Sequence, residues 1–437
     1  MKRIKAVAQR SHRTDERPSS RRRFLGKLTL AGATLAMPLS GFPNITGKAR
    51  PHLRVLGTHV TLQEAIRRRA EADLGIRISF QPGGSAEVLH QATTRPESFD
   101  IYEQWSNSLK VLWNAQTIQP LRVDRITYWN EINDLPKSGQ IAPGAQSGRG
   151  DAPHKLLYVQ EDGGLGPRET DRTSFLPYVH NTDSFGYDTR FIPPGTPYEE
   201  ESWGWLLNEK WNGRVALINA PTIGLFDAAL AVQAKGLMRF EDIGNMTRSE
   251  IDQLFDILVD YRRSGHFRGF WTSVPHSVEL MGRGEVVIQS MFSPGVSTLN
   301  GMGIPCRFAA PREGYRAWYG VMCLSSAARG ETEEAAYAFM NWWLSGWPGA
   351  FIARQGYYIS NPSRSRGRME KAEWDYWYAG KPAAKELTGT DGKVCVRPGE
   401  VRNGGSYTNR FSKVAVWNTV MDLYEYTLLR WKEFLLA

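Results

Sequence analysis

The sequence predicts an α/β protein of two lobes, with mainly parallel sheets and helices on both faces. Three observations support this prediction. The chain has 437 residues, which exceeds one typical domain and suits two lobes of ordinary size. A strand–helix–strand alternation begins near residue 53, and a second α/β set follows between about 181 and 297. The composition, 41% hydrophobic and 23% charged, is that of a globular chain with a large core.

The first α/β set opens with a short apolar strand at 53–57 and a helix. One face of this helix repeats every four residues, through Leu62, Ile66, Ala70 and Leu74. Thr61 and Glu64 have the spacing of a capping box at its start, and Gly75 is expected to end it. The next expected elements are a strand at 76–80, a short helix at 85–92 and a strand at 99–104. Units of this length favour parallel strand pairing with a right-handed crossover.

The middle of the chain begins with an expected exposed excursion at 133–153, which is rich in Gly, Pro, Ser and Ala. The segment 175–189 is expected to cross between the lobes in extended form. The string at 201–221 predicts a helix, a glycine turn and a strand. The clearest helix is 247–265, with a capping box at Thr247 and Glu250 and a stop at Gly265. The remaining expected elements are a strand at 284–292, a turn with flanking strands at 304–326, a helix at 331–346 and a single last helix at about 408–436.

The first fifty residues carry the basic charge of the chain. They hold twelve of its 54 Lys and Arg residues and two of its 45 Asp and Glu residues, which leaves 42 basic against 43 acidic. A basic arm, a short weakly apolar stretch and a polar linker follow one another, which is the organisation of a signal peptide. The string SRRRFL at 20–25, with Arg21 and Arg22 as its pair, resembles a twin-arginine export signal. We therefore expect export to the periplasm by the twin-arginine translocase, cleavage within 36–51, and no nucleic-acid partner.

The sequence carries no recognisable signature of catalysis. It has no G-x-S-x-G, no H-E-x-x-H, no P-loop and no EF-hand pattern, and its eight histidines have no metal-type spacing. We therefore expect no enzyme activity, no metal and no cofactor. The cysteines are Cys306, Cys323 and Cys395, without a C-x-x-C pair. Cys306 and Cys323 flank a predicted turn, so a disulfide between them and simple buried thiols are both open.

Polar and aromatic side chains gather where the predicted strands end. In open α/β sheets, ligands bind outside the carboxyl ends of strands. The candidate ligand-binding residues at these ends are Thr58, His59, Ser85, Trp105, Ser106, Asn219, Thr222, Phe292 and Ser293. The other candidates are Trp271 and Trp318, expected in loops, and His180 in the crossing segment. Trp105, within the polar string EQWSNS, is favoured as a direct ligand contact.

The order of several strings resembles the periplasmic solute-binding proteins of ABC importers, in the spermidine/putrescine-binding branch. The strings are FDIYEQWSNSLKVL, PYVHNTDSFGYD, ESWGWLLNEKWNGRVALINAP, GRGEVVIQSMFSPG, EGYRAWYGVMCLSSAA and AYAFMNWWLSGWPGAFIARQGYYISNP, and the resemblance covers about 53–435. It implies a two-lobed periplasmic-binding-protein fold of type II with a hinge crossed twice, which captures a small-molecule solute. It also implies a membrane permease and a cytoplasmic ATPase as partners.

The fold and this resemblance together set the expected domain boundaries. Residues 1–45 are expected to be the signal peptide and linker. Residues 50–180 and 298–345 are expected to form the first lobe, and residues 181–297 the second. Residues 346–437 are expected to be C-terminal helices that pack on the lobes.

The polyamine chemistry of the resembling branch does not carry over to this sequence. Those proteins hold a cationic solute with carboxylates and aromatic rings. Here the strand end at 219–223 carries no acid, the position after the next strand reads Phe292-Ser293, and the only nearby acids are Glu103 and Asp183. The sequence thus favours a sugar-like or zwitterionic solute, a small organic acid or a quaternary ammonium. The alternatives are a polyamine or ferric-ion binder, a periplasmic enzyme exported folded, and a signalling receptor.

Overall fold

The computed structural model describes residues 50–437, so the predicted signal with Arg21 and Arg22 lies outside the described residues. Among the described residues, a twelve-stranded sheet has a main path in the order β11-β10-β12-β9-β14-β3-β1-β2. The strands of the path are β1 (His52–Thr58), β2 (Arg77–Gly83), β3 (Ile101–Trp105), β9 (Leu176–Asp188), β10 (Val215–Ile218), β11 (Phe267–Trp271), β12 (Ile288–Met291) and β14 (Tyr315–Ser325). The other four strands are β4 (Ile118–Gln119), β13 (Cys306–Phe308), β15 (Tyr358–Ile359) and β18 (Val414–Trp417).

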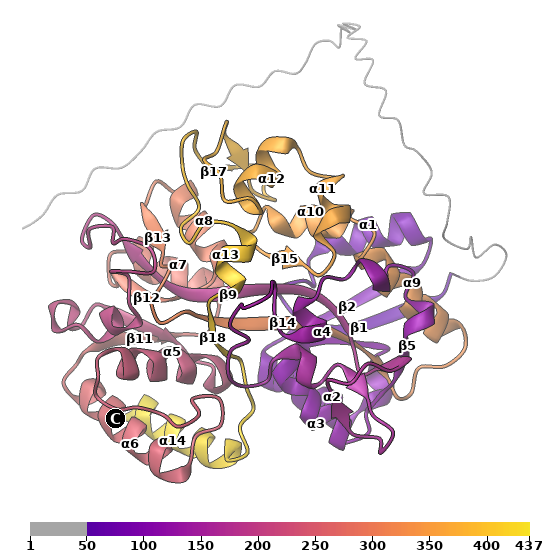
Figure 1. Ribbon diagram of the computed structural model, residues 1–437, viewed down its shortest axis with the longest axis horizontal. Helices are drawn as coiled ribbons and strands as arrows, with labels where there is room; N and C mark the ends of the chain where they lie inside the picture. Colours follow the sequence, from indigo (N-terminus) through magenta and orange to yellow (C-terminus); the bar gives the residue numbers. More distant parts are fainter. Residues whose placement is uncertain (1–49) are drawn as a thin grey trace, which may run out of the picture. The chain divides into compact units, whose positions relative to one another are not determined.

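Two long antiparallel strands, β9 and β14, run through the middle of this sheet (Figure 1). On one side, β1 pairs in parallel with both β2 and β3. On the other side, β10 pairs in parallel with both β11 and β12. The strands β3 and β12 join the central pair in antiparallel fashion. The carboxyl ends of the parallel strands on both sides therefore meet over β9 and β14.

Helices cover the two halves of the sheet separately. The first half carries α1 (Glu64–Leu74), α2 (Ser85–Thr94), α3 (Leu109–Asn114) and α9 (Glu331–Trp343). The second half carries α5 (Pro221–Ala234), α6 (Arg248–Arg263), α7 (Val274–Gly282), α8 (Ser293–Gly301) and the C-terminal α14 (Tyr424–Leu436). The segment after α9 adds α10 (Trp347–Ala353), α11 (Pro362–Arg366), α12 (Lys371–Trp377) and α13 (Tyr407–Phe411). Separate core clusters fill the two halves, and a third lies between the central strands and this segment.

The smaller elements lie between these. They are the helix α4 (Leu135–Ser138), a sheet of β5 (Leu121–Arg122), β6 (Tyr158–Val159), β7 (Leu165–Gly166) and β8 (Arg172–Thr173), and the hairpin β16 (Leu387–Thr388) with β17 (Val394–Val396). Short 3₁₀ helices cover Trp203–Leu207 and Glu209–Trp211, where the sequence predicted one helix. None of the described helices is long and apolar enough to cross a membrane.

Local sequence signals decide several of these elements. Thr247 and Glu250 form the predicted capping box of α6, and Gly75 ends α1 in the left-handed conformation. The predicted capping box of α1 is wrong. Its N-cap is Gln63, and the Thr61 hydroxyl bonds instead to the Tyr178 hydroxyl, 2.9 Å away. The Thr61 side chain therefore makes a long-range hydrogen bond with Tyr178 and does not cap the helix.

Two longer predictions are also wrong. The expected helix at 408–436 is interrupted, because β18 pairs in parallel with β14 between α13 and α14. The expected exposed excursion at 133–153 is held against this strand by bridges from Gln146 to Lys413 and from Arg149 to Val416. Its apolar members Leu135 and Ala152 are buried.

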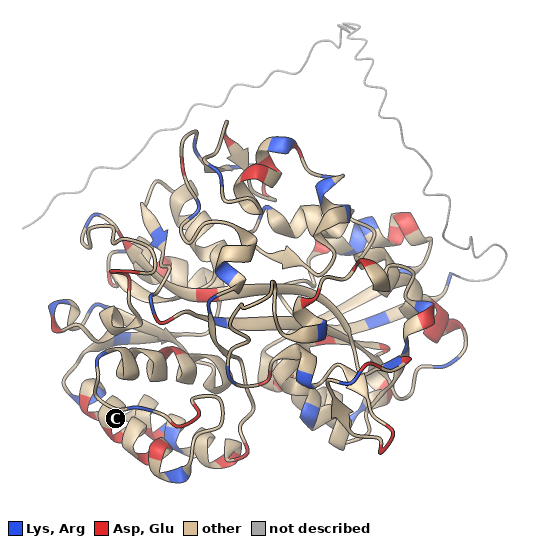
Figure 2. Cartoon of the chain, viewed as in Figure 1, with Lys and Arg blue, Asp and Glu red and all other residues tan. Residues whose placement is uncertain are grey.

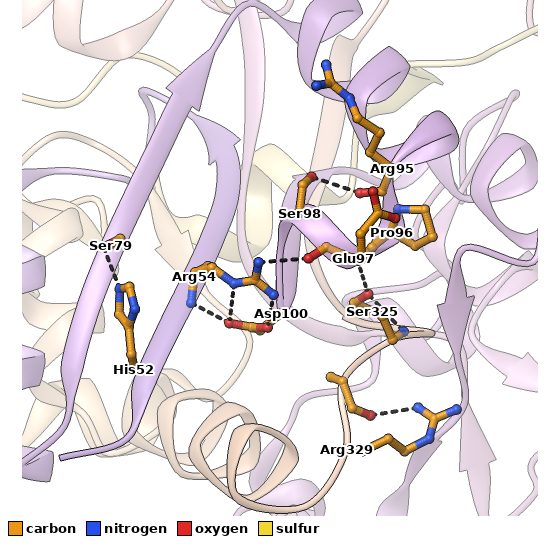
Figure 3. A network of polar contacts seen from close by, with 12 residues as sticks. His52, Arg54, Ser79, Arg95, Pro96, Glu97, Ser98, Asp100, Ser325 and Arg329 are labelled. Carbon is orange, nitrogen blue, oxygen red and sulfur yellow. Dashed lines mark hydrogen bonds and ion pairs between the residues drawn. The ribbon is translucent and has the colours of Figure 1, made fainter. Parts of the chain in front are cut away.

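An ion-pair network fixes the ends of β1, β3 and β14 that lie away from the carboxyl edge (Figure 3). The guanidinium of Arg54 donates to the nearly buried Asp100, with 2.7 Å between Nη2 and Oδ1, and its Nη1 donates to the Glu97 carbonyl. The Ser325 hydroxyl donates to the Pro96 carbonyl at 2.6 Å. These contacts hold the three strands in register, so that the carboxyl ends of β1 and β3 stay side by side.

Charge and cysteine chemistry are unremarkable outside the first fifty residues. Basic and acidic residues are interspersed over both halves (Figure 2), as 42 basic against 43 acidic residues would suggest. The three cysteines are free thiols, so the disulfide alternative for Cys306 and Cys323 is wrong. Cys306 lies on β13, and Cys323 lies in the part of β14 that pairs with β3. Burial raises the pKa of both thiols.

Candidate functional site

A small cavity lies where the carboxyl ends of the parallel strands meet over the central pair. Its volume is about 10 Å³, roughly the space of one water molecule and far below the roughly 300–1,000 Å³ that is typical of small-molecule pockets. The lining residues come from both halves of the sheet and from the C-terminal segment: Val60, Trp105, Ile223, Phe292, Trp318, Tyr357 and Asn418. The two halves are therefore closed on this space.

The walls of the cavity are mainly aromatic. Trp318 on β14 lies edge-on to Trp105 at the end of β3, with 6.4 Å between ring centroids, and to Tyr357 at 5.4 Å. From the other half, Phe292 follows β12 and is supported by an edge-on contact with Trp271 at 5.2 Å. Rings in such an arrangement offer both flat apolar surface and π faces to a solute.

A buried ionic network lies beside the aromatic walls on the same face of the central strands. Arg316 of β14 is opposite Asp183 of β9 in the sheet register. Its Nε donates to Asp227 of α5 at 2.6 Å, its Nη1 donates to Asn418 Oδ1 at 3.0 Å, and its Nη1 lies 3.5 Å from Asp183 Oδ2. The side chains of Arg316, Asp183 and Asp227 are 0% exposed. The network joins the crossing strands to the second half of the molecule.

Several polar atoms of this network lack hydrogen-bond partners among the described residues. They include one donor group of Arg316 (Nη2), one of Asn418 (Nδ2), and acceptor oxygens of Asn181, Asp183 and Asp227. Buried polar groups in proteins are almost always satisfied, so a cluster of open donors and acceptors calls for an explanation. A solute that carries both hydrogen-bond donors and acceptors would satisfy them.

Burial changes the protonation of the two aspartates. It raises the pKa of Asp183 from its ordinary 3.8 to about 7, with the nearby Arg316 charge opposing the shift and Asp227 adding to it. Burial likewise raises the pKa of Asp227, against the attraction of Arg316. Neither aspartate lines the cavity, but both belong to the network that reaches it through Asn418, and perturbed carboxyl groups beside a cleft are a common mark of a functional site.

Glu103, the other acid that the sequence placed nearby, is satisfied within the first half. Its Oε2 accepts the Thr58 backbone N–H at 3.0 Å, and its other oxygen accepts the Tyr178 hydroxyl. A Cβ at Gly57 would stand 2.5 Å from the Glu103 carbonyl oxygen, so the glycine permits this close approach of β1 and β3. Glu103 thus links β1, β3 and β9 within the first half, whereas Asp183 belongs to the ionic network with Arg316.

The structure brings together only part of the predicted site. Trp105, Phe292 and Trp318 line the cavity, and Ser293 lies beside it, with its hydroxyl 3.4 Å from the Asn181 amide. Trp271 supports Phe292 from behind. Trp271 and Trp318 were expected in loops, which is wrong, because Trp271 ends β11 and Trp318 lies within β14.

The remaining predicted residues do not line the cavity. Thr58 binds Glu103, Ser106 donates to the Asp151 carbonyl at 3.1 Å, and Asn219 accepts the Trp431 indole N–H of α14 at 3.0 Å. The Ser85 carbonyl accepts from Gln104, His59 is exposed, and Thr222 is half-buried in the first turn of α5.

His180 faces away from the cavity. Its ring stacks on Tyr319 at 4.4 Å between centroids and bonds to the Tyr407 hydroxyl at 2.7 Å. Burial lowers its pKa to about 3, so the ring is neutral. It is a core residue between the central strands and the C-terminal segment.

Sequence reasoning missed the most polar members of the site. These are Arg316, Asp227, Asn418 and Asn181, together with the ring of Tyr357. One signal was available: Arg316 is the single charge within the otherwise apolar string YRAWYGVMCL, and such a charge needs a buried partner. Nothing in the string indicates that the partners are 89 and 102 residues away.

Comparisons with known proteins address the fold and the family. Residues 65–380 match the model of a family described as bacterial extracellular solute-binding protein. No curated protein sequence matches the chain significantly. The family match and the sequence resemblance to solute-binding proteins therefore agree.

Solved structures of similar fold include a putative spermidine/putrescine ABC transporter protein of Listeria monocytogenes, with a TM-score of 0.61, 13% identity, and coverage of 88% of this chain and 98% of that chain. The spermidine/putrescine substrate-binding protein PotD of Streptococcus pneumoniae has a TM-score of 0.58, 13% identity and coverage of 88% and 99%. The binding protein AgtB of A. tumefaciens R10, in complex with agropinic acid, has a TM-score of 0.55, 13% identity and coverage of 89% and 100%. These likenesses confirm the predicted two-lobed α/β fold of type II periplasmic binding proteins.

Proposed function

The chain belongs to the family of bacterial extracellular solute-binding proteins, and we propose that it is the substrate-binding component of an ABC importer. In this role it delivers a small solute to a membrane permease that is driven by a cytoplasmic ATPase. Residues 50–180 with 298–345 form one lobe, residues 181–297 form the other, and the segment 346–437 packs on both. The strands β9 and β14 are the hinge about which the lobes open and close.

We propose that the solute is a small zwitterion with an apolar or cyclic body. The carrying observation is the pairing of aromatic walls with open donors on Arg316 and open acceptors on Asp183 and Asn181. A solute carboxylate would accept from the guanidinium, and a solute ammonium would lie against a ring face and a carboxylate. Among the solutes that the sequence favoured, the ionic network supports the zwitterion over a neutral sugar-like solute.

A polyamine is the second candidate, since the carboxylates of Asp183 and Asp227 outnumber the single guanidinium of Arg316. Arg316 argues against it, because a second cation between these groups would have to share carboxylates that the guanidinium already contacts. The two candidates predict opposite responses to spermidine.

The solute class is tested by thermal shift and tryptophan fluorescence with the purified protein. The panel contains small zwitterions such as betaines and amino acids, neutral sugars, dicarboxylates, spermidine and putrescine. We expect a zwitterion to raise the melting temperature and to change the fluorescence, since Trp105 and Trp318 line the cavity. Ligand at about 100 times its Kd stabilises by about 2.7 kcal/mol, a shift that is easily measured.

Matched variants locate the binding to the cavity. Trp105→Phe should lower the affinity for the zwitterion by about tenfold or more, which is within the usual range for truncating a buried aromatic anchor. Trp113→Phe, at a partly exposed tryptophan of the same half that bonds to the Gly163 carbonyl, should leave affinity unchanged. Strong stabilisation by micromolar spermidine, with no response to zwitterions, would overturn the proposed solute class and leave the transport role in place.

We further propose that the chain reaches the periplasm folded, through the twin-arginine translocase. The support is the string at 20–25 and the concentration of basic charge in the first fifty residues. Replacing Arg21 and Arg22 together by lysine should hold the precursor in the cytoplasm, as measured by cell fractionation. A control in which Lys2 and Arg3 are exchanged for Arg and Lys should be exported normally. Normal export of the Arg21→Lys, Arg22→Lys variant would refute the route.

A further inference from the structure

A second, larger crevice lies between α8 with β13 and the C-terminal segment. It is open to solvent, with a volume of about 360 Å³. Ser297 and Asn300 of α8 and Arg307 of β13 line one side, and Trp377, Arg402 and Arg410 line the other. None of these residues lines the aromatic cavity. The crevice thus has its own lining, although Ser293, which lies beside the cavity, also borders the crevice.

Two of the lining arginines are buried. Arg402 is 7% exposed and Arg410 is 1% exposed, so both guanidinium groups have lost most of their water. Arg402 donates to the Tyr358 hydroxyl at 2.6 Å and to the carbonyls of Trp377 and Gly356. Arg410 donates to the carbonyls of Asn403 and Thr182 at 2.9 and 3.1 Å. All of these partners are neutral.

Neither buried guanidinium has a counter-ion among the residues that the structure describes. The carboxylate of Asp183 lies beside Arg316, and no ion pair joins it to Arg410 in the described chain. The two arginines repel each other, and burial lowers the pKa of Arg402. Aromatic rings give partial compensation, with Tyr358 and Trp377 about Arg402 and Tyr315 and Phe308 about Arg410. Buried charges are normally paired, so this arrangement lacks an anion.

The other charged groups of the crevice do not supply that anion. Arg307 is paired with Glu201 at 3.0 Å, so Glu201 is already engaged. Arg397 and Glu400 line the crevice from exposed positions. In the described chain, no ion pair joins Glu400 to Arg402 or Arg410. The interior of the crevice is therefore positive, and the Nε of Arg410 has no hydrogen-bond partner among the described residues.

We propose that this crevice is an anion-binding site, in which a carboxylate or phosphate group of a small molecule is held between Arg402 and Arg410. The anion supplies the missing counter-charge and accepts a hydrogen bond from the free Nε of Arg410. Because guanidinium groups match planar and tetrahedral oxyanions, both carboxylate and phosphate fit this chemistry. The bound anion ties α8 and β13 of the second half to the C-terminal segment.

Calorimetric titration of the full chain at low ionic strength tests the proposal. The probes are inorganic phosphate, acetate and citrate, each compared with chloride at the same ionic strength. We expect saturable binding of phosphate or of a carboxylate at submillimolar concentration, and the preferred probe assigns the ligand class. Arg402→Gln should weaken this binding by about tenfold or more, within the range for losing a charged hydrogen-bond donor.

Arg397→Gln is the matched control, since it removes the same charge from an exposed position of the same crevice. It should change affinity less than about twofold, as expected for a screened surface charge. Equal losses in both variants, or no saturable binding of any probe by the wild-type chain, would overturn the proposal. If Arg402→Gln does not fold, Arg410→Lys, which keeps the charge and removes Nε, replaces it with the same expected loss. Trp105→Phe should leave anion binding intact, which separates this test from that of the solute cavity.

Discussion

Replacement of Arg316 by methionine is expected to lower the free energy of unfolding by about 3–5 kcal/mol. The guanidinium is fully buried and contacts Asp183, Asp227 and Asn418. Its removal leaves two buried carboxylates without their ion-pair partner, which is the costly way to break a buried ion pair. Urea unfolding at pH 8, where both variant and wild type are measured under two-state conditions, gives the difference directly.

Two comparisons make this expectation specific. Arg312→Met removes an exposed arginine that pairs with Glu313 at 3.1 Å, and it should cost less than about 1 kcal/mol. Adding Asp227→Leu to Arg316→Met should recover part of the loss, because one stranded carboxylate is then replaced by an apolar group. A loss below about 1 kcal/mol for Arg316→Met would mean that the carboxylates take up protons and that the ion pair contributes little.

The parts of the fold that the sequence predicted are those whose signals are local. The helix α6 combines an apolar face with a capping box, and both signals lie within its sixteen residues and the N-cap Thr247. The last helix shows the opposite case. Phe411, Val414, Trp417 and Met421 fit a helical period, but Val414 and Trp417 belong to β18, which pairs with β14 about a hundred residues earlier. Tertiary pairing overrode the local period, and only the partner strand could have revealed it.

Some residues of the candidate site could likewise be predicted from the sequence, and others could not. Trp105 and Phe292 follow predicted strands, so their place at the carboxyl edge could be read from the order of elements. His180 was assigned to the site because it lies on the crossing strand. All thirteen residues of β9 are buried, so alternation of polar and apolar residues could not show which face meets the cavity. Asn181 and Asp183 point to the cavity face, and His180 points to the opposite core.

Asp183→Asn is expected to stabilise the protein relative to wild type increasingly as the pH rises from about 4 to about 8. Burial raises the pKa of Asp183 from 3.8 to about 7, so over this interval the folded protein holds a proton that the unfolded chain has released. The wild type therefore loses stability as the pH rises through about 7. Three pKa units correspond to a loss of up to about 4 kcal/mol, which asparagine does not suffer because it does not ionise.

Urea unfolding of both proteins at a series of pH values measures this difference, and other titrating groups cancel in the comparison. Asp124→Asn is the control, since Asp124 is exposed beside Arg122, which lowers its pKa, and its titration lies below the interval. The protonation state of Asp183 also affects how a solute would bind. Below about pH 7 Asp183 is protonated and donates a hydrogen bond, whereas above it the carboxylate attracts an ammonium. A constant difference between Asp183→Asn and wild type would mean that Arg316 keeps Asp183 ionised throughout, and the affinity for a zwitterion should then be independent of pH in the same range.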